Sequence, residues 1–350
     1  KITCSVLRPL NIWYSIKDIR NLSIVVLLIR SIVHIFSWSV FRGIIQADIV
    51  LISGINPWVS AVITFTRKIL RRNTVIDVHG FTWLEASVMK TNLFYRMLLL
   101  ISEKLSFENA DYIIAASPWL AKVLREYFRI RNIYVVENAI SYIFEYTMNK
   151  IRKISIDPLL IIRSDRLRNV ISKARSDNKL IFISALPDVF KANVLAYQTL
   201  LDIAKALSNK ALILVTGFAK SKDLTRIDNI VHTGYLTWIE YVALLMIVNG
   251  AIYAFPRSAI CGGARNKVLE VGYSKKLLVS TSTGVMHTRF KPIVHYIPVE
   301  HLLSILAAND HNRIEQLTDA IHRIILSYYD FRKFKLNLLK TLTVIFKKLR

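Results

Sequence analysis

The chain of 350 residues is longer than a typical single domain, so two domains of ordinary size are expected. A hydrophobic fraction of 53% excludes a disordered chain and supplies apolar residues for two cores. Lys and Arg total 48 against 24 Asp and Glu, a formal charge of +24 that attracts nucleic acid, anionic lipid or phosphorylated substrates. Alternatively, much of this charge is simply solvated.

The cysteines and the N-terminal region indicate in which cellular compartment the protein is expected. Cys4 and Cys261 are too few and too far apart in sequence for a disulfide framework or a zinc site, which favours a reducing cytoplasm. No apolar core of a secretory signal occurs in residues 1–19. Residues 22–40 have the length of a membrane span, but Arg30 at mid-span would cost roughly 2.5–3.5 kcal/mol. A buried or interfacial helix is therefore the better prediction.

Short β-rich runs alternate with helical segments in the first half of the chain. Strands are predicted over 49–53, 74–78, 112–116 and 133–136. One helix is predicted to begin near Pro57, and a second spans 92–107. A third begins at Ser117, a favourable N-cap that is followed by proline. Strand and helix in alternation predict a parallel sheet with crossover helices.

Residues 140–178 break this rhythm, and we interpret them as an inter-domain connection with an irregular helix. The alternation then returns, with strands predicted over 180–184, 212–216, 230–232, 251–255 and 277–280, and helices over 193–207, 238–248 and 267–273. The fold class is therefore α/β with two Rossmann-like domains. The predicted domains are residues 1–150, residues 151–330, and a basic C-terminal helix over 331–350.

A glycine-bearing loop follows the strand predicted over 251–255, where parallel sheets place ligands. It opens a helix with the sequence C-G-G-A-R-N-K-V-L-E, residues 261–270. Backbone N–H groups at Gly262 and Gly263, with the helix dipole, favour a pyrophosphate. Arg265 and Lys267 add positive charge, and Glu270 could accept the two hydroxyls of a ribose. The alternative is a simple glycine turn with Glu270 on the surface.

This segment resembles the donor-binding region of glycosyltransferase family 4, whose members have the GT-B fold. The resemblance covers P-R-S-A-I-C-G-G-A-R-N-K-V-L-E and the small residues that end at Gly284. In the first half, D-V-H-G at residues 77–80, Glu103, A-D-Y-I-I-A-A-S at residues 110–117 and V-V-E-N at residues 135–138 occur in the family's order. The resemblance therefore spans roughly residues 47–326.

The resemblance implies two Rossmann-like domains that face a cleft, and transfer of a sugar with retention of configuration and without a metal. His79 matches the family histidine that reaches the donor sugar and phosphate, which makes it the predicted catalytic residue. Glu270 matches the carboxylate that binds the donor ribose, and Lys191 lies near the phosphate-binding lysine. Gly262, Gly263, Arg265, Asn266 and Lys267 complete the predicted donor site. No cofactor is expected, because the nucleotide sugar is a substrate.

The sequence departs from the family pattern at several positions. The first of two family glutamates falls at Gly262, and the usual Gly-Arg after the first strand of the second domain reads Ser184-Ala185. The first glycine is Gly43, so no glycine loop follows the strand predicted over 2–7. Either the chain is truncated at its start or its acceptor side is unusual. No Asp-x-Asp motif occurs, which argues against a metal-dependent transferase of the other major fold.

The C-terminal tail is basic and amphipathic. It carries seven Lys or Arg and no acid, while Phe334, Leu338, Leu342, Ile345 and Leu349 share one helical face. Either this face packs across the domains, or the tail meets an anionic membrane surface, or both.

We therefore predict a cytoplasmic glycosyltransferase, peripheral on the inner face of the membrane, that acts on a glycan or lipid-linked acceptor. One alternative is a non-catalytic relative that binds nucleotide sugar or glycan. Another is a basic nucleic-acid-binding protein, although no nucleic-acid motif occurs and no specific nucleic-acid partner is expected.

Overall fold

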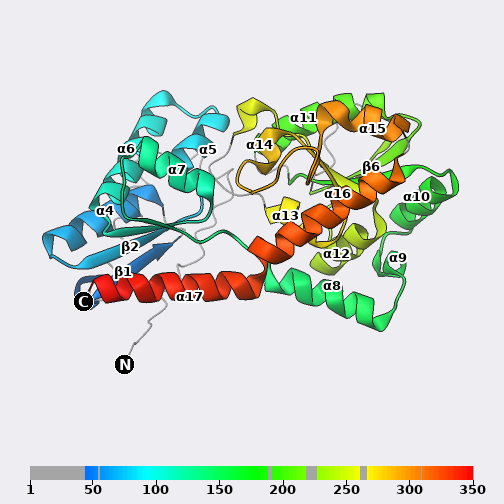
Figure 1. The fold of residues 1–350 in the computed structure, drawn as a ribbon. Helices are drawn as coiled ribbons and strands as arrows, with labels where there is room; N and C mark the ends of the chain where they lie inside the picture. The colour runs from blue at the N-terminus through cyan, green and yellow to red at the C-terminus, as the bar shows by residue number, and fades with distance from the viewer. Residues whose placement is uncertain are drawn as a thin grey trace.

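The computed structural model describes residues 44–53, 56–187, 191–217, 227–260, 266–308 and 310–349. The strand predicted over 2–7 and the helix predicted over 22–40 lie outside these residues. Two parallel sheets, each covered by helices, form the two halves of the molecule (Figure 1). This arrangement confirms the predicted α/β fold class with two Rossmann-like domains.

The first sheet has the strand order β1-β2-β3-β4, and all its pairings are parallel. Its strands are β1 (Ile49–Ser53), β2 (Asn73–Val78), β3 (Tyr112–Ala115) and β4 (Ile133–Val135). The helices of this half are α4 (Pro57–Ile69), α5 (Thr82–Val88), α6 (Leu93–Asn109) and α7 (Pro118–Glu126). All four strands lie within one or two residues of their predicted positions, because each is a short apolar run that ends at polar or small residues.

The second sheet has the strand order β10-β9-β8-β5-β6-β7, again parallel throughout. Its strands are β5 (Leu180–Ala185), β6 (Ala211–Thr216), β7 (Ile230–Gly234), β8 (Gly250–Tyr253), β9 (Leu277–Ser280) and β10 (Ile297–Pro298). Its helices are α8 (Tyr142–Ile154), α9 (Pro158–Ile161), α10 (Asp165–Ser176), α11 (Lys191–Ala206), α12 (Trp238–Ile247), α13 (Asn266–Tyr273), α14 (Ser282–Val285), α15 (Leu302–Ala308) and α16 (His311–Ile324). Short helical turns at Arg257–Ala259, Val299–His301 and Ile325–Tyr329 complete this half.

The structure of residues 140–178 differs from the prediction, because the segment forms three regular helices and an irregular connection was expected. Phe144, Met148 and Ile151 of α8 are buried at helical spacing in the core of the second half. Ser164 caps the N-terminus of α10, since its Oγ accepts the Leu167 N–H. The abundant charges of this region lie on the outward faces and obscure a regular apolar stripe. The α8 helix, which the predicted boundary at residue 150 divides, thus packs with the second core.

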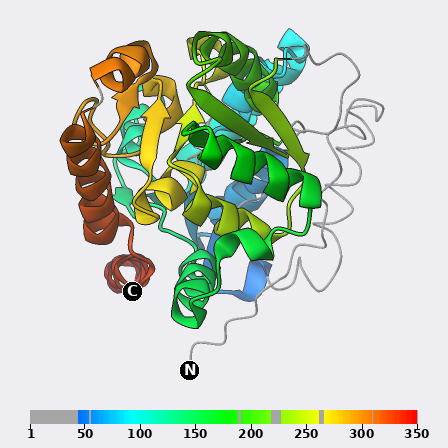
Figure 2. The ribbon, with the colours of Figure 1, turned by 90° about the vertical axis from the view of Figure 1, so that its right-hand side faces the viewer.

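The C-terminal helix α17 (Phe331–Lys348) crosses back and packs beneath the first sheet (Figure 1; Figure 2 shows it nearly end-on). Its five predicted apolar positions, from Phe334 to Leu349, all pack against a cluster that contains Val75, Ile114 and Val136. Hydrophobic burial therefore explains the apolar face of the tail.

The chain passes between the two halves twice. Residues 136–141 lead out of the first half, and residues 329–331 return to it. The two passages contact each other, because the Ile140 N–H donates to the Tyr329 carbonyl oxygen at 2.9 Å. Near this point Arg289 Nε donates to Glu137 Oε1 at 2.6 Å, which joins the second half to the first.

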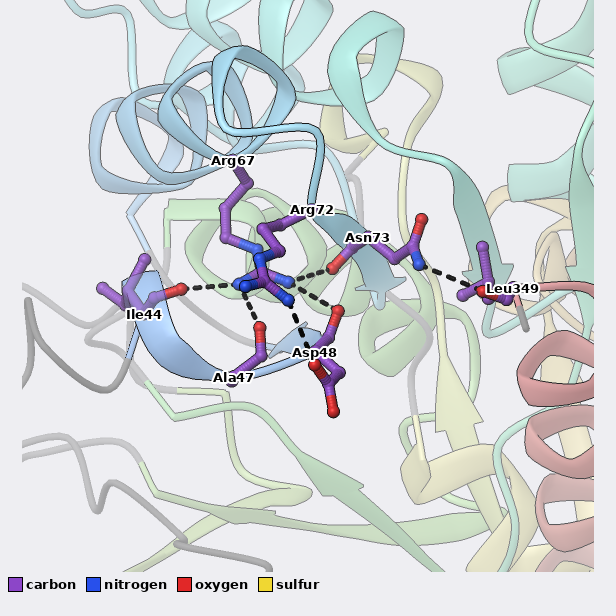
Figure 3. A network of polar contacts seen from close by, with 7 residues as sticks. All are labelled: Ile44, Ala47, Asp48, Arg67, Arg72, Asn73 and Leu349. Atoms are coloured by element: carbon purple, nitrogen blue, oxygen red, sulfur yellow. Dashed lines mark hydrogen bonds and ion pairs between the residues drawn. The ribbon is translucent and has the colours of Figure 1, made fainter.

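A buried arginine holds the segment that enters the first sheet (Figure 3). The fully buried Arg67 guanidinium donates to four backbone carbonyl oxygens, at distances of 2.6 to 3.0 Å. The acceptors belong to Ile44, Ala47, Asp48 and Asn73. Arg67 thus ties the end of α4 to the segment that enters β1, and to the start of β2.

Candidate active site

A cavity of about 390 Å³ opens at the carboxyl end of the first sheet. It is lined by the ends of β1 and β2, by α5 and α6, and by Asn138 of the first passage between the halves. Asn266, the first residue of α13, lines it from the second half. The cavity therefore lies between the two halves, at the strand ends where open parallel sheets bind ligands.

His79 follows β2 directly and lines this cavity. Its Nε2 lies 2.8 Å from Asp77 Oδ2, and Ser53 Oγ donates to the same oxygen at 3.0 Å. The hydrogen bond to Asp77 raises the pKa of His79, partial burial opposes this, and the Asp77 charge and a hydrogen bond with Asn138 add to it. His79 therefore keeps its proton to a higher pH than an isolated histidine, as a donor to a phosphate oxygen should.

The predicted donor residues of α13 fall into two groups. Asn266 lines the cavity, whereas Lys267 and Glu270 are not among its lining residues. Glu270 is only 5% exposed, and its Oε2 accepts from the Tyr241 hydroxyl at 2.8 Å and from Lys267 Nζ at 3.1 Å. Lys267 Nζ also lies 4.1 Å from the centre of the Tyr241 ring. The ribose and phosphate roles of Glu270 and Lys267 stay predictions.

The charge of Glu270 is only partly balanced. Burial raises the pKa of its carboxyl group, and the Lys267 charge and the hydrogen bond from Tyr241 oppose this increase. A carboxylate held in this way gains stability from further hydrogen-bond donors, such as ribose hydroxyls.

The other predicted donor residues lie apart from the cavity or outside the described residues. Lys191 begins α11 with an exposed side chain and is not among the lining residues. Gly262, Gly263 and Arg265 lie outside the part of the chain that the structure describes.

Glu103 is a site residue to which sequence analysis gave no role. It lies on α6, is 5% exposed and lines the cavity, and its Oε1 accepts the Thr82 N–H at 2.6 Å. Burial raises the pKa of Glu103 to about 7, against the effect of hydrogen bonds from Thr82 and Trp83. A signal was present in the sequence, because Glu103 shares the helical spacing of the buried residues Leu99 and Ser106.

Comparison with known proteins adds the fold relationship. No known protein-family model matches the sequence, and no curated protein matches it. The structure is similar to a sucrose-phosphate synthase from Thermosynechococcus elongatus, with 13% identity and a TM-score of 0.63 over 90% of this chain and 78% of that one. It is also similar to Anabaena HepE in complex with UDP, with 12% identity and a TM-score of 0.61 over 88% and 81% of the two chains.

A putative UDP-N-acetylglucosamine 2-epimerase from Listeria monocytogenes has 12% identity and a TM-score of 0.52, over 94% of this chain and 81% of that one. At these identities the similarity shows the fold, and proteins of different reactions share it. The chain has the GT-B fold: two Rossmann-like domains with parallel sheets, and a cavity between them.

Proposed function

We propose that the protein is a glycosyltransferase that moves a sugar from a nucleotide-sugar donor to a glycan or lipid-linked acceptor. One observation carries this proposal: His79 of the first domain and Asn266 of the second line a single cavity at the carboxyl end of a parallel sheet. The motifs that resemble family 4 contain both residues. The same resemblance supports retention of configuration and a reaction without a metal.

The geometry fits a donor that lies between the domains. The bond between the anomeric carbon and the diphosphate oxygen breaks, and a bond to an acceptor hydroxyl oxygen forms. The nucleoside diphosphate leaves with a negative charge, and the hydroxyl proton is released. A protonated His79 donates a hydrogen bond to the departing oxygen, while the N-terminal end of α13 faces the phosphates. These interactions strengthen as charge develops, which lowers the barrier.

Membrane association is a separate part of this proposal. The apolar face of α17 packs against the first domain, so the membrane would meet its outer face, which carries exposed Lys335, Lys340 and Lys347. Among the described residues, no helix has both the length and the apolar character of a membrane span. Anionic vesicles should therefore bind the protein through charge, with an affinity that falls as salt rises.

A thermal-shift screen across UDP-, GDP-, ADP- and TDP-sugars tests the proposal first. A donor at one hundred times its Kd should stabilise the protein by about 2.7 kcal/mol. Incubation with that donor should then release the nucleoside diphosphate, and the anomeric configuration of the product, read by NMR, should match that of the donor. A chelator should leave the rate unchanged.

Two variants locate the site. Replacing His79 by Ala should reduce turnover more than donor binding, whereas Glu270→Ala should weaken donor binding. Binding without any transfer would indicate a non-catalytic relative, and epimerised nucleotide sugar as the product would indicate the other reaction found with this fold. Wild-type behaviour of both variants would overturn the site assignment.

A further inference from the structure

The cavity is acidic in a basic protein. Asp77, Glu85 and Glu103 line it, and no Lys or Arg of the described residues does. The whole chain carries 48 Lys and Arg against 24 Asp and Glu, so the charge of the cavity lining is opposite to that of the protein. We call these three carboxylates, with the part of the cavity that they line, the acidic pocket.

One carboxylate oxygen of the acidic pocket has no partner. The Glu103 side chain is more than nine-tenths buried, and its Oε1 accepts the Thr82 N–H. Its Oε2 is buried and has no hydrogen-bond partner among the described residues. Asp77 differs, because its carboxylate already contacts His79 and Ser53. Glu103 therefore lines the cavity and has one buried carboxylate oxygen without a hydrogen-bond partner among the described residues.

An unpaired buried carboxylate is unfavourable, and a ligand that donates to it removes this penalty. A protonated amine suits the position best, since it brings a positive charge and up to three N–H donors. A neutral hydroxyl donates a weaker bond. A phosphate is repelled by the carboxylates of Glu85 and Glu103, so the donor diphosphate belongs on the side of His79 and the start of α13.

We propose that the acidic pocket binds the protonated amine of an amino-sugar acceptor, which donates to Glu103 Oε2. This inference rests on the proposed function and names the class of acceptor that the transferase takes. The acceptor amine thus lies on the first-domain side, while a hydroxyl of the same sugar faces the donor. An N-acetylated sugar has no such charge and loses the interaction.

Calorimetric titration at pH 7 tests the proposal without a donor. Glucosamine and galactosamine are compared with their N-acetyl forms, with glucose and with glucose 6-phosphate. At least one amine should bind about tenfold or more tightly than its N-acetyl form, since hydrogen bonds to charged groups have this strength. Equal binding of both forms, no binding of either amine, or a preference for the phosphate overturns the proposal.

Two variants of α6 make the test specific. Glu103→Gln keeps an oxygen to accept the Thr82 N–H but removes the charge, so it should abolish the preference for the amine. Glu108→Gln is the matched control, because this exposed residue pairs only with Lys104, at 3.7 Å, among the described residues. Glu108→Gln should bind like wild type. A preference that survives in Glu103→Gln rejects Glu103 as the recognition residue.

A donor thermal-shift screen on the same preparations separates the two proposals. If no nucleotide sugar stabilises the protein while amines bind through Glu103, the acidic pocket stands and the transferase proposal fails. If a donor stabilises the protein and amines show no preference, the transferase proposal stands and the acceptor class is wrong.

Discussion

His79 Nε2 lies 2.8 Å from Asp77 Oδ2, at the end of β2. Asp77 is the last but one residue of β2 and His79 directly follows the strand, so the two side chains are two positions apart at the strand end. The pair therefore follows from the local sequence D-V-H, and the cavity around it follows from the packing of two domains.

Asp77→Asn should lower the pKa of His79, because the hydrogen bond to the Asp77 carboxylate is the largest cause of its increase. The imidazolium would then lose its proton at a lower pH, and the alkaline limb of the pH–rate profile should move to lower pH. Ser53→Ala is the control, since it removes a hydrogen bond to the same oxygen and keeps the charge. An unmoved alkaline limb would exclude His79 as the titrating donor.

Glu103→Gln should change how stability depends on pH. The folded-state pKa of Glu103, at about 7, lies above the ordinary value of 4.5, so the folded state holds the proton more tightly than the unfolded state. Stability from this group is complete below about pH 4.5 and is lost as pH rises to about 7, a loss of about 3 kcal/mol at most.

The melting temperature of Glu103→Gln should therefore rise relative to wild type between pH 5 and pH 8. Thermal unfolding across this range measures the difference. A difference that is constant with pH would mean that the Glu103 carboxyl has an ordinary pKa.

Tyr241→Phe should free the Glu270 carboxylate from one buried donor. The hydroxyl donates to Glu270 Oε2 at 2.8 Å, and loss of a buried hydrogen bond of this kind costs roughly 1–3 kcal/mol. If Glu270 binds the donor ribose, its freer carboxylate should also bind donor with a changed Kd. Urea unfolding and a donor titration, measured on the same variant, separate the two effects. Tyr235→Phe, at an exposed tyrosine, serves as the control.

Arg67→Met should destabilise the first domain by about 3 kcal/mol or more, because it leaves four backbone carbonyl oxygens without their donor. Arg72→Met is the matched control, since its exposed pair with Asp48 contributes at most about 1 kcal/mol. Urea unfolding measures both variants. Equal losses would contradict the role that the structure gives to the Arg67 network.

Ile345→Ala should cost about 2–5 kcal/mol, because the side chain is fully buried between α17 and the first sheet. Val344→Ala changes the adjacent residue, which is 42% exposed, and should leave the melting temperature nearly unchanged. If both variants melt like wild type, α17 does not pack on the first domain in solution.

The helices of residues 142–176 show why part of the fold escaped prediction. Phe144, Met148 and Ile151 have helical spacing, but the basic and acidic residues between them make the segment look like a charged connection. The strands were easier to predict, because parallel strands covered on both faces are continuous apolar runs such as L-I-F-I-S-A in β5. For the C-terminal tail, the sequence allowed either packing across the domains or contact with an anionic membrane. Only the packing of Phe334 and Ile345 on the first sheet shows where its apolar face lies.

The sequence by itself determined the alternation of strands and helices, the position of His79 after a strand and the apolar stripe of α17, because these depend on local periodicity. Tertiary structure alone decided that Asn266 and His79 line one cavity, that Glu270 accepts from the Tyr241 hydroxyl, and that Glu103 keeps one oxygen unpaired. These residues are far apart in the chain, and the burial and charge of each side chain depend on how the domains pack.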